Sequence, residues 1–154
     1  MQKLDYRREL QELLVRFANA MSQTDPNTTF LQLWCILERI TDTIGGRYDE
    51  TIKRVLWLYV DRPDMKERLE HLRFRRNQYV HAAKSDSTME QTVYSAKSFV
   101  EDHLLRLIRN DFGVASLNEY GKFLSLPTNV ETLKKRREHL DRAIQIRDKK
   151  DSSE

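Results

Sequence analysis

The stretch DPNTTFLQLWCILERITDTI, residues 25–44, decides the fold. Asp25 and Pro26 predict a helix start, because Asp is a favoured N-cap residue and Pro suits the first helical position. Apolar residues then recur at spacings of three and four, which indicates one face of a helix. This stripe comprises Phe30, Leu33, Trp34, Leu37, Ile40 and Ile44, and it is widened by Leu31 and Cys35. We therefore expect a helix that ends before Gly45-Gly46 and lies at the centre of a helical bundle.

The remainder of the chain also favours helices. Among 154 residues there are only four glycines and three prolines, a balance that favours long helices with short connections. We expect further helices over about 4–21, 48–60, 63–80, 88–110 and 116–124, and from a start signal at 127–131 to about 147. Capping boxes at Ser87–Glu90 and Thr128–Glu131 support two of these starts.

The predicted fold is therefore all-α, with four to five main helices in a bundle and a C-terminal helical extension. A chain of 154 residues suits one core. We expect a single domain over residues 1–147 and a flexible tail over 148–154.

Composition excludes several classes of protein. A single cysteine, Cys35, excludes an intrachain disulfide and a cysteine zinc site, and we expect it to be a small core residue. The longest apolar run, Leu33–Leu37, is too short to span a membrane, so we expect a soluble cytoplasmic protein without a membrane partner. The acidic residues are scattered, and neither a metal nor a cofactor is expected. A net charge of +3 permits RNA binding without requiring it.

Arg76 occupies a position where the helix pattern calls for an apolar residue. The expected helix after Pro63 has an apolar face that comprises Met65, Leu69, Leu72, Tyr79 and Val80. Arg76 falls within this stripe, although a guanidinium is always charged. Burying it without a partner would cost several kcal/mol, on the order of the penalty for an unpaired buried ion. Arg76 therefore either pairs with a carboxylate, for which Glu38 is the candidate, or lines a water-filled cleft.

The same helix has a second face, formed by Phe74, Asn77 and His81. An exposed aromatic residue beside a histidine suggests a contact surface. A homodimer that pairs two such faces across a two-fold axis would bring two histidines together. A structural role is the alternative, because a histidine at a helix end often neutralises the C-terminal carbonyl groups. Of the other histidines, His103 is expected to be a satisfied core residue and His139 to be solvated.

Three segments resemble the HEPN superfamily. Arg76-Asn77-Gln78-Tyr79-Val80-His81 resembles its R-N-x-x-x-H motif. Residues 30–38, FLQLWCILE, are similar to the apolar-Trp-x-x-apolar-Glu helix of the Apea-like HEPN group, and residues 117–127 resemble the EYxxFLxLP tail of that group. The similarity covers about residues 25–147. Ala82-Ala83 is a departure, because many relatives have glycine after the histidine.

The resemblance implies a metal-independent endoribonuclease that acts as a homodimer, in a prokaryotic defence or toxin setting. His81 would transfer protons, Arg76 would stabilise the charged phosphate, and Asn77 would orient His81 or hold a phosphate. The products would be a 2′,3′-cyclic phosphate and a 5′-hydroxyl. Residues assigned to RNA binding are Arg73, Arg75 and Tyr79, although core packing is the alternative for Tyr79. Residues assigned to structural support are Trp34 and Glu38.

Two other interpretations remain open. The chain could be a non-catalytic HEPN module that dimerises or binds RNA or a protein partner, because a motif does not prove turnover. It could also be a regulatory helical domain of a larger protein, with a missing N-terminal domain. An inhibitory partner is compatible with the enzymatic interpretation.

Overall fold

The computed structural model describes residues 5–79 and 88–151. Within these ranges the fold is all-α, as expected. The helices are α1 (Arg7–Met21), α2 (Pro26–Ile40), α3 (Tyr48–Leu56), α4 (Pro63–Tyr79), α5 (Met89–Arg109), α6 (Leu117–Phe123) and α7 (Val130–Asp151).

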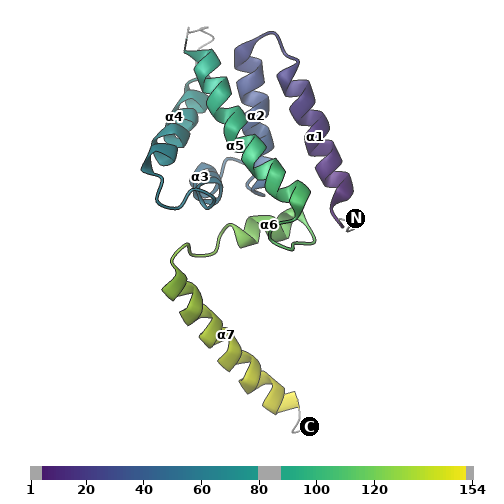
Figure 1. Cartoon of the computed structure of the whole chain (residues 1–154), viewed down its shortest axis with the longest axis vertical. Helices are drawn as coiled ribbons and strands as arrows, with labels where there is room; N and C mark the ends of the chain where they lie inside the picture. Colours follow the sequence, from purple (N-terminus) through teal and green to yellow (C-terminus); the bar gives the residue numbers. More distant parts are fainter. Residues whose placement is uncertain (1–4, 80–87, 152–154) are drawn as a thin grey trace.

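The central position expected for α2 is confirmed. This helix packs against α1, α3, α4, α5 and α6, and its largest interface is with α5. In Figure 1 α1, α2 and α5 lie side by side, α3 and α4 flank them, and α6 crosses one end of the bundle. The predicted stripe supplies the core side chains of α2, which include Phe30, Leu33, Trp34, Leu37 and Ile40. Burying large apolar side chains of this kind contributes roughly 1.5–3 kcal/mol each before entropy is counted.

Helix α2 ends at Ile40 rather than at residue 44, which corrects the predicted boundary. The hydroxyl of Thr41 donates to the carbonyl of Leu37 at 2.7 Å, and Asp42 adopts a left-handed conformation with a φ of 54°. Asp is one of the few residues that tolerate this conformation, so the chain turns before it reaches the glycines. As a consequence Ile44 is 58% exposed. Cys35, which we expected in the core, is also exposed.

Other helix ends differ from the prediction in smaller ways. Helix α3 ends at Leu56, and α7 continues to Asp151, so the tail predicted from residue 148 is helical over 148–151. The side chain of Asn129, not of Thr128, accepts a hydrogen bond from the Thr132 amide at the start of α7. Ser87 lies outside the described residues, and Thr88, which occupies the N-cap position of α5, makes no side-chain capping bond.

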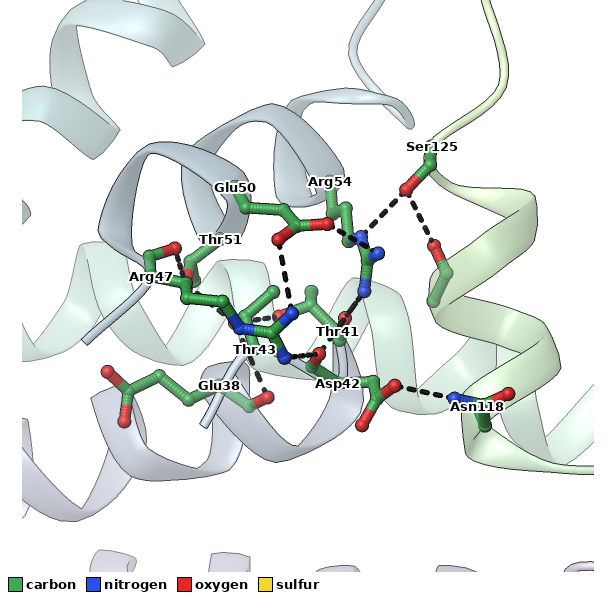
Figure 2. Close-up of polar contacts among 11 residues, drawn as sticks. Glu38, Thr41, Asp42, Thr43, Arg47, Glu50, Thr51, Arg54, Asn118 and Ser125 are labelled. Carbon is green, nitrogen blue, oxygen red and sulfur yellow. Dashed lines mark hydrogen bonds and ion pairs between the residues drawn. The ribbon is translucent and has the colours of Figure 1, made fainter. Parts of the chain in front are cut away.

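A polar network, shown in Figure 2, joins the end of α2 to α3 and α6. The buried guanidinium of Arg54 forms an ion pair of 2.5 Å with Glu50 and donates to the Thr41 carbonyl and the Ser125 hydroxyl. A Cβ at Gly121 would lie 2.8 Å from both Arg54 Nη1 and the Thr41 carbonyl oxygen. The close approach of α6 to this network therefore requires glycine at position 121.

His103 is a satisfied core residue, as predicted. Its ring is fully buried, and its Nε2–H donates to the Val55 carbonyl at 3.2 Å. Its Nδ1 then accepts from the Tyr120 hydroxyl at 2.9 Å. Burial lowers the pKa of His103 to about 4, so the ring is neutral in the folded protein. This histidine connects α5 to α3 and α6.

Candidate functional site

Arg76 lies near the end of α4 with its guanidinium 5.2 Å from the centre of the Tyr48 ring, where it makes a cation–π contact. Its Nε is buried and has no hydrogen-bond partner. Among the residues that the structure describes, no carboxylate forms an ion pair with Arg76. In the described part of the chain this charge is thus held by an aromatic face, and no acidic side chain is paired with it.

Glu38, the carboxylate expected as a partner for Arg76, bonds to Trp34 instead. Trp34 Nε1 donates to Glu38 Oε1 at 3.0 Å, and both side chains are buried on α2. Trp34 also packs against Tyr48, with ring centres 6.1 Å apart. The two residues therefore fix the Tyr48 ring on which the guanidinium of Arg76 rests.

Cys35 lies on the same side of α2, within electrostatic reach of both Glu38 and Arg76. Although the residue is exposed, partial desolvation of its thiol and the charge of Glu38 raise the pKa of Cys35, against a smaller lowering by Arg76. A thiol with a raised pKa is protonated at neutral pH and is a poor nucleophile. This thiol is therefore unsuited to nucleophilic catalysis.

The second predicted face of α4 is only partly within the described residues. Phe74 is 57% exposed, and Asn77 is also exposed, in agreement with the predicted surface position of this face. His81 lies outside the described residues, as does the side chain of Tyr79. The catalytic role of His81 and the RNA-binding role of Tyr79 therefore stay predictions.

A cleft of about 530 Å³ lies between α4 and α5. Its lining residues are Arg68, His71 and Arg75 on α4, Thr88 before α5, and Gln91, Thr92, Tyr94 and Ser95 on α5. None of these residues is acidic. The cleft has the size of a small-ligand site, and its basic side chains favour an anion.

Uncharged side chains hold the guanidinium of Arg68 in place at the cleft. The guanidinium of Arg68 donates to the Ser95 hydroxyl at 3.2 Å and lies 5.8 Å from the centre of the Phe99 ring. Arg75 donates to the Thr88 hydroxyl. Tyr94, which is 66% exposed, provides an aromatic face at the edge of the cleft. A positively charged groove beside an exposed aromatic ring is the usual arrangement for single-stranded nucleic acid.

Arg73 points toward α3 and does not line this cleft. Its guanidinium forms ion pairs with Asp49 at 2.7 Å and Glu70 at 3.7 Å, so its charge is balanced locally. Arg75, by contrast, lines the cleft between α4 and α5. Binding of RNA by either residue stays a prediction, but the geometry favours Arg75.

Sequence reasoning missed most of the cleft. The signal that could have found it is the spacing of Arg68, His71 and Arg75, which are three and four residues apart and therefore share one face of α4. The residues contributed by α5 could not be paired with them without knowing how the two helices pack.

Other charged features fit no metal site. Within residues 5–79 and 88–151, no group of three or more histidine, cysteine or acidic side chains could hold a metal ion. The basic run Lys134–Arg137 is exposed on α7, and His139 is exposed as predicted. None of the described helices is long and apolar enough to cross a membrane.

No family model, curated protein or solved structure matches the chain.

Proposed function

We propose that this protein is a metal-independent endoribonuclease of the HEPN type. The observation that supports this proposal most directly is the state of Arg76, a half-buried guanidinium without a carboxylate partner among the described residues. Such a group can donate two parallel hydrogen bonds to phosphate oxygens. It precedes His81 by five positions, in the order of the R-N-x-x-x-H motif.

The proposed reaction needs no external nucleophile. The 2′-hydroxyl oxygen of RNA attacks the adjacent phosphorus while the His81 imidazole accepts the hydroxyl proton. The bond from phosphorus to the 5′ oxygen breaks, and the proton that the His81 imidazole accepted is transferred to that leaving oxygen. Arg76 stabilises the negative charge that accumulates on the non-bridging phosphate oxygens. The products are a 2′,3′-cyclic phosphate and a 5′-hydroxyl.

The cleft between α4 and α5 is the proposed path for the RNA strand. Arg68 and Arg75 are seven residues apart on one helix, so their backbones are separated by about 10.5 Å along the axis. This separation can span successive phosphates of an extended strand, while Tyr94 offers a face on which a base can stack. Variants Arg68→Gln and Tyr94→Ala should raise KM for RNA more than they lower kcat.

The test is cleavage of a labelled single-stranded RNA in the presence of EDTA. His81→Ala should lower the cleavage rate by about 100- to 10,000-fold, the typical contribution of general acid–base catalysis. Arg76→Gln should lower it by about 100-fold or more. His139→Ala and Arg109→Gln change exposed residues away from the site and serve as matched controls with unchanged rates.

The chemical outcome gives a second check. Mass spectrometry should find the cyclic phosphate, and a single 2′-deoxy nucleotide at the cut position should block cleavage there. Equal cleavage by the His81→Ala variant and the parent would refute the proposal, as would a strict requirement for Mg²⁺ or no cleavage by either protein. Circular dichroism of each variant excludes unfolding as the cause of lost activity.

A non-catalytic binding or assembly module is the second candidate. The exposed apolar residues of α7 and the exposed Phe74 favour it, because such residues often mark interfaces. Under this proposal the protein binds RNA or a protein partner, and His81→Ala changes neither binding nor RNA integrity. A defence or toxin role in the cytoplasm belongs to the enzymatic proposal and derives from the HEPN resemblance.

A further inference from the structure

Helix α7 is the longest helix of the described chain, and it leaves the bundle. It comprises 22 residues, which corresponds to a length of about 33 Å. Figure 1 shows α7 pointing away from the other helices, and none of the main helix interfaces involves it. Nevertheless it carries exposed apolar side chains, among them Val130, Leu140 and Ile144. A solitary helix of this composition gains little stability from its own sequence.

The apolar residues of α7 follow a heptad pattern. With Val130 at position a, the a and d positions are Val130, Leu133, Arg137, Leu140, Ile144 and Arg147. Four of these six residues are apolar, and they lie along one side of the helix. Spacings of three and four over three heptads are typical of a helix that pairs with another helix.

The two arginines in this stripe determine which pairing is possible. In a parallel pair of identical helices, each core residue faces its own copy, so Arg137 would face Arg137 and Arg147 would face Arg147. Like charges at such short range are unfavourable. In an antiparallel pair, position a of one helix faces position d of the other. Arg137 then lies beside Leu140, along which its aliphatic stem can pack while its charge reaches water.

The same antiparallel register aligns the remaining core residues. Leu133 faces Ile144 of the second copy, and this apolar layer occurs twice because of the two-fold axis. Val130 faces Arg147 at each end of the helix pair. The register therefore places the apolar side chains against one another and separates the arginines.

The flanking charges are complementary in this register. Lys134 and Asp141 both occupy position e, and antiparallel helices bring the e positions of the two copies together. Lys134 of each copy then lies beside Asp141 of the other, which gives two identical opposite-charge pairs. Within one chain Lys134 pairs with Glu131 at 3.0 Å, but both side chains are exposed, so exchanging this partner costs little.

From these observations we infer that α7 pairs with α7 of a second copy of the chain as an antiparallel two-stranded coiled coil. The two bundles then lie at opposite ends of the helix pair. This interface is separate from the Phe74, Asn77 and His81 face of α4 and does not depend on ribonuclease activity.

The experiment measures self-association of the full chain by sedimentation equilibrium. The parent should associate reversibly, and Leu140→Glu should weaken the association at least tenfold because it places a charge in the core stripe. Ile146→Glu is the matched control, since Ile146 is equally exposed but lies at position c, outside the stripe. It should leave the dissociation constant unchanged.

A charge exchange tests the orientation. Asp141→Lys should weaken association about tenfold, since it creates two like-charge pairs with Lys134. Adding Lys134→Asp should restore the affinity, because both pairs are then opposite in charge again. A parallel pair would instead place Asp141 near Arg136. In that arrangement Lys134→Asp would not restore the affinity that Asp141→Lys removes.

The proposal is overturned by a parent that stays monomeric at all concentrations, or by association that Leu140→Glu leaves unchanged. Failure of the charge exchange to restore affinity would overturn the antiparallel orientation. None of these results depends on whether the protein cleaves RNA, so the two proposals fail separately.

Discussion

Acid should destabilise this protein through His103, and the change His103→Gln tests that effect. In the folded state the ring is fully buried and its pKa is lowered from 6.5 to about 4, chiefly because burial penalises the charged form. The unfolded chain binds a proton at this site below about pH 6.5, whereas the folded chain does so only below about pH 4. The unfolded state therefore binds more protons between these values, so stability falls as the pH falls through this window.

The size of the effect follows from the two pKa values. Each unit of difference corresponds to about 1.36 kcal/mol. Between pH 7.5 and pH 4.5, His103 should lower the free energy of unfolding by about 2.5 kcal/mol. This loss is a large fraction of the stability of a small domain, which is typically about 5–15 kcal/mol.

Urea unfolding followed by circular dichroism at both pH values measures this quantity. The loss of stability between pH 7.5 and pH 4.5 should be smaller in His103→Gln than in the parent by about 2.5 kcal/mol, whatever the variant's stability at pH 7.5. His139→Gln, which changes an exposed histidine, should behave as the parent. Equal pH dependence in His103→Gln and the parent would refute the reasoning, because carboxylates elsewhere titrate alike in both proteins.

Three further substitutions test how the helices are joined, each by urea unfolding at neutral pH. Gly121→Ala should cost about 1–3 kcal/mol, since its Cβ would lie 2.8 Å from Arg54 Nη1 and a backbone oxygen; unchanged stability would mean that α6 shifts freely. Ser125→Ala removes the acceptor for Arg54 Nε and should cost about 1 kcal/mol. Tyr6→Phe removes the 2.6 Å hydrogen bond to the Leu107 carbonyl and should also cost about 1 kcal/mol, and a neutral result would show that water replaces the hydroxyl.

The sequence predicted the centre of the fold better than its edges. The stripe of α2 lies in the core, because its five large apolar residues form a helix face that is buried against several neighbouring helices. The predicted end of that helix is wrong, because the sequence pattern assigns the stop to the glycines at 45 and 46 and the helix ends at Ile40. Threonine hydroxyls that bond to helix carbonyls and an aspartate in the left-handed conformation end the helix earlier. Such local competition between side chain and backbone is not visible in a periodicity pattern.

Only those features of the candidate site that arise from a single helix could be predicted from the sequence. The unusual position of Arg76 follows from the spacing of α4 alone. The Tyr48 ring beneath it and the α5 side of the basic cleft depend on tertiary packing, since they come from helices whose mutual orientation the sequence does not specify. The predicted core position of Cys35 is wrong because it also depends on tertiary packing. A residue at the edge of the stripe can be either buried or exposed, according to which helix packs beside it.

The choice of partners around Arg76 bears directly on what the site can bind. An ion pair with Glu38 would hold the guanidinium rigidly, but a phosphate would then have to displace a carboxylate before it could bind. Instead Glu38 accepts a hydrogen bond from Trp34, and Arg76 rests on Tyr48. A cation–π contact is worth about 0.5–2 kcal/mol and, unlike an ion pair, does not use the N–H groups of the guanidinium. The carboxylate on α2 thus helps to hold the aromatic support in place, and within the described residues no carboxylate competes with an anionic ligand for Arg76.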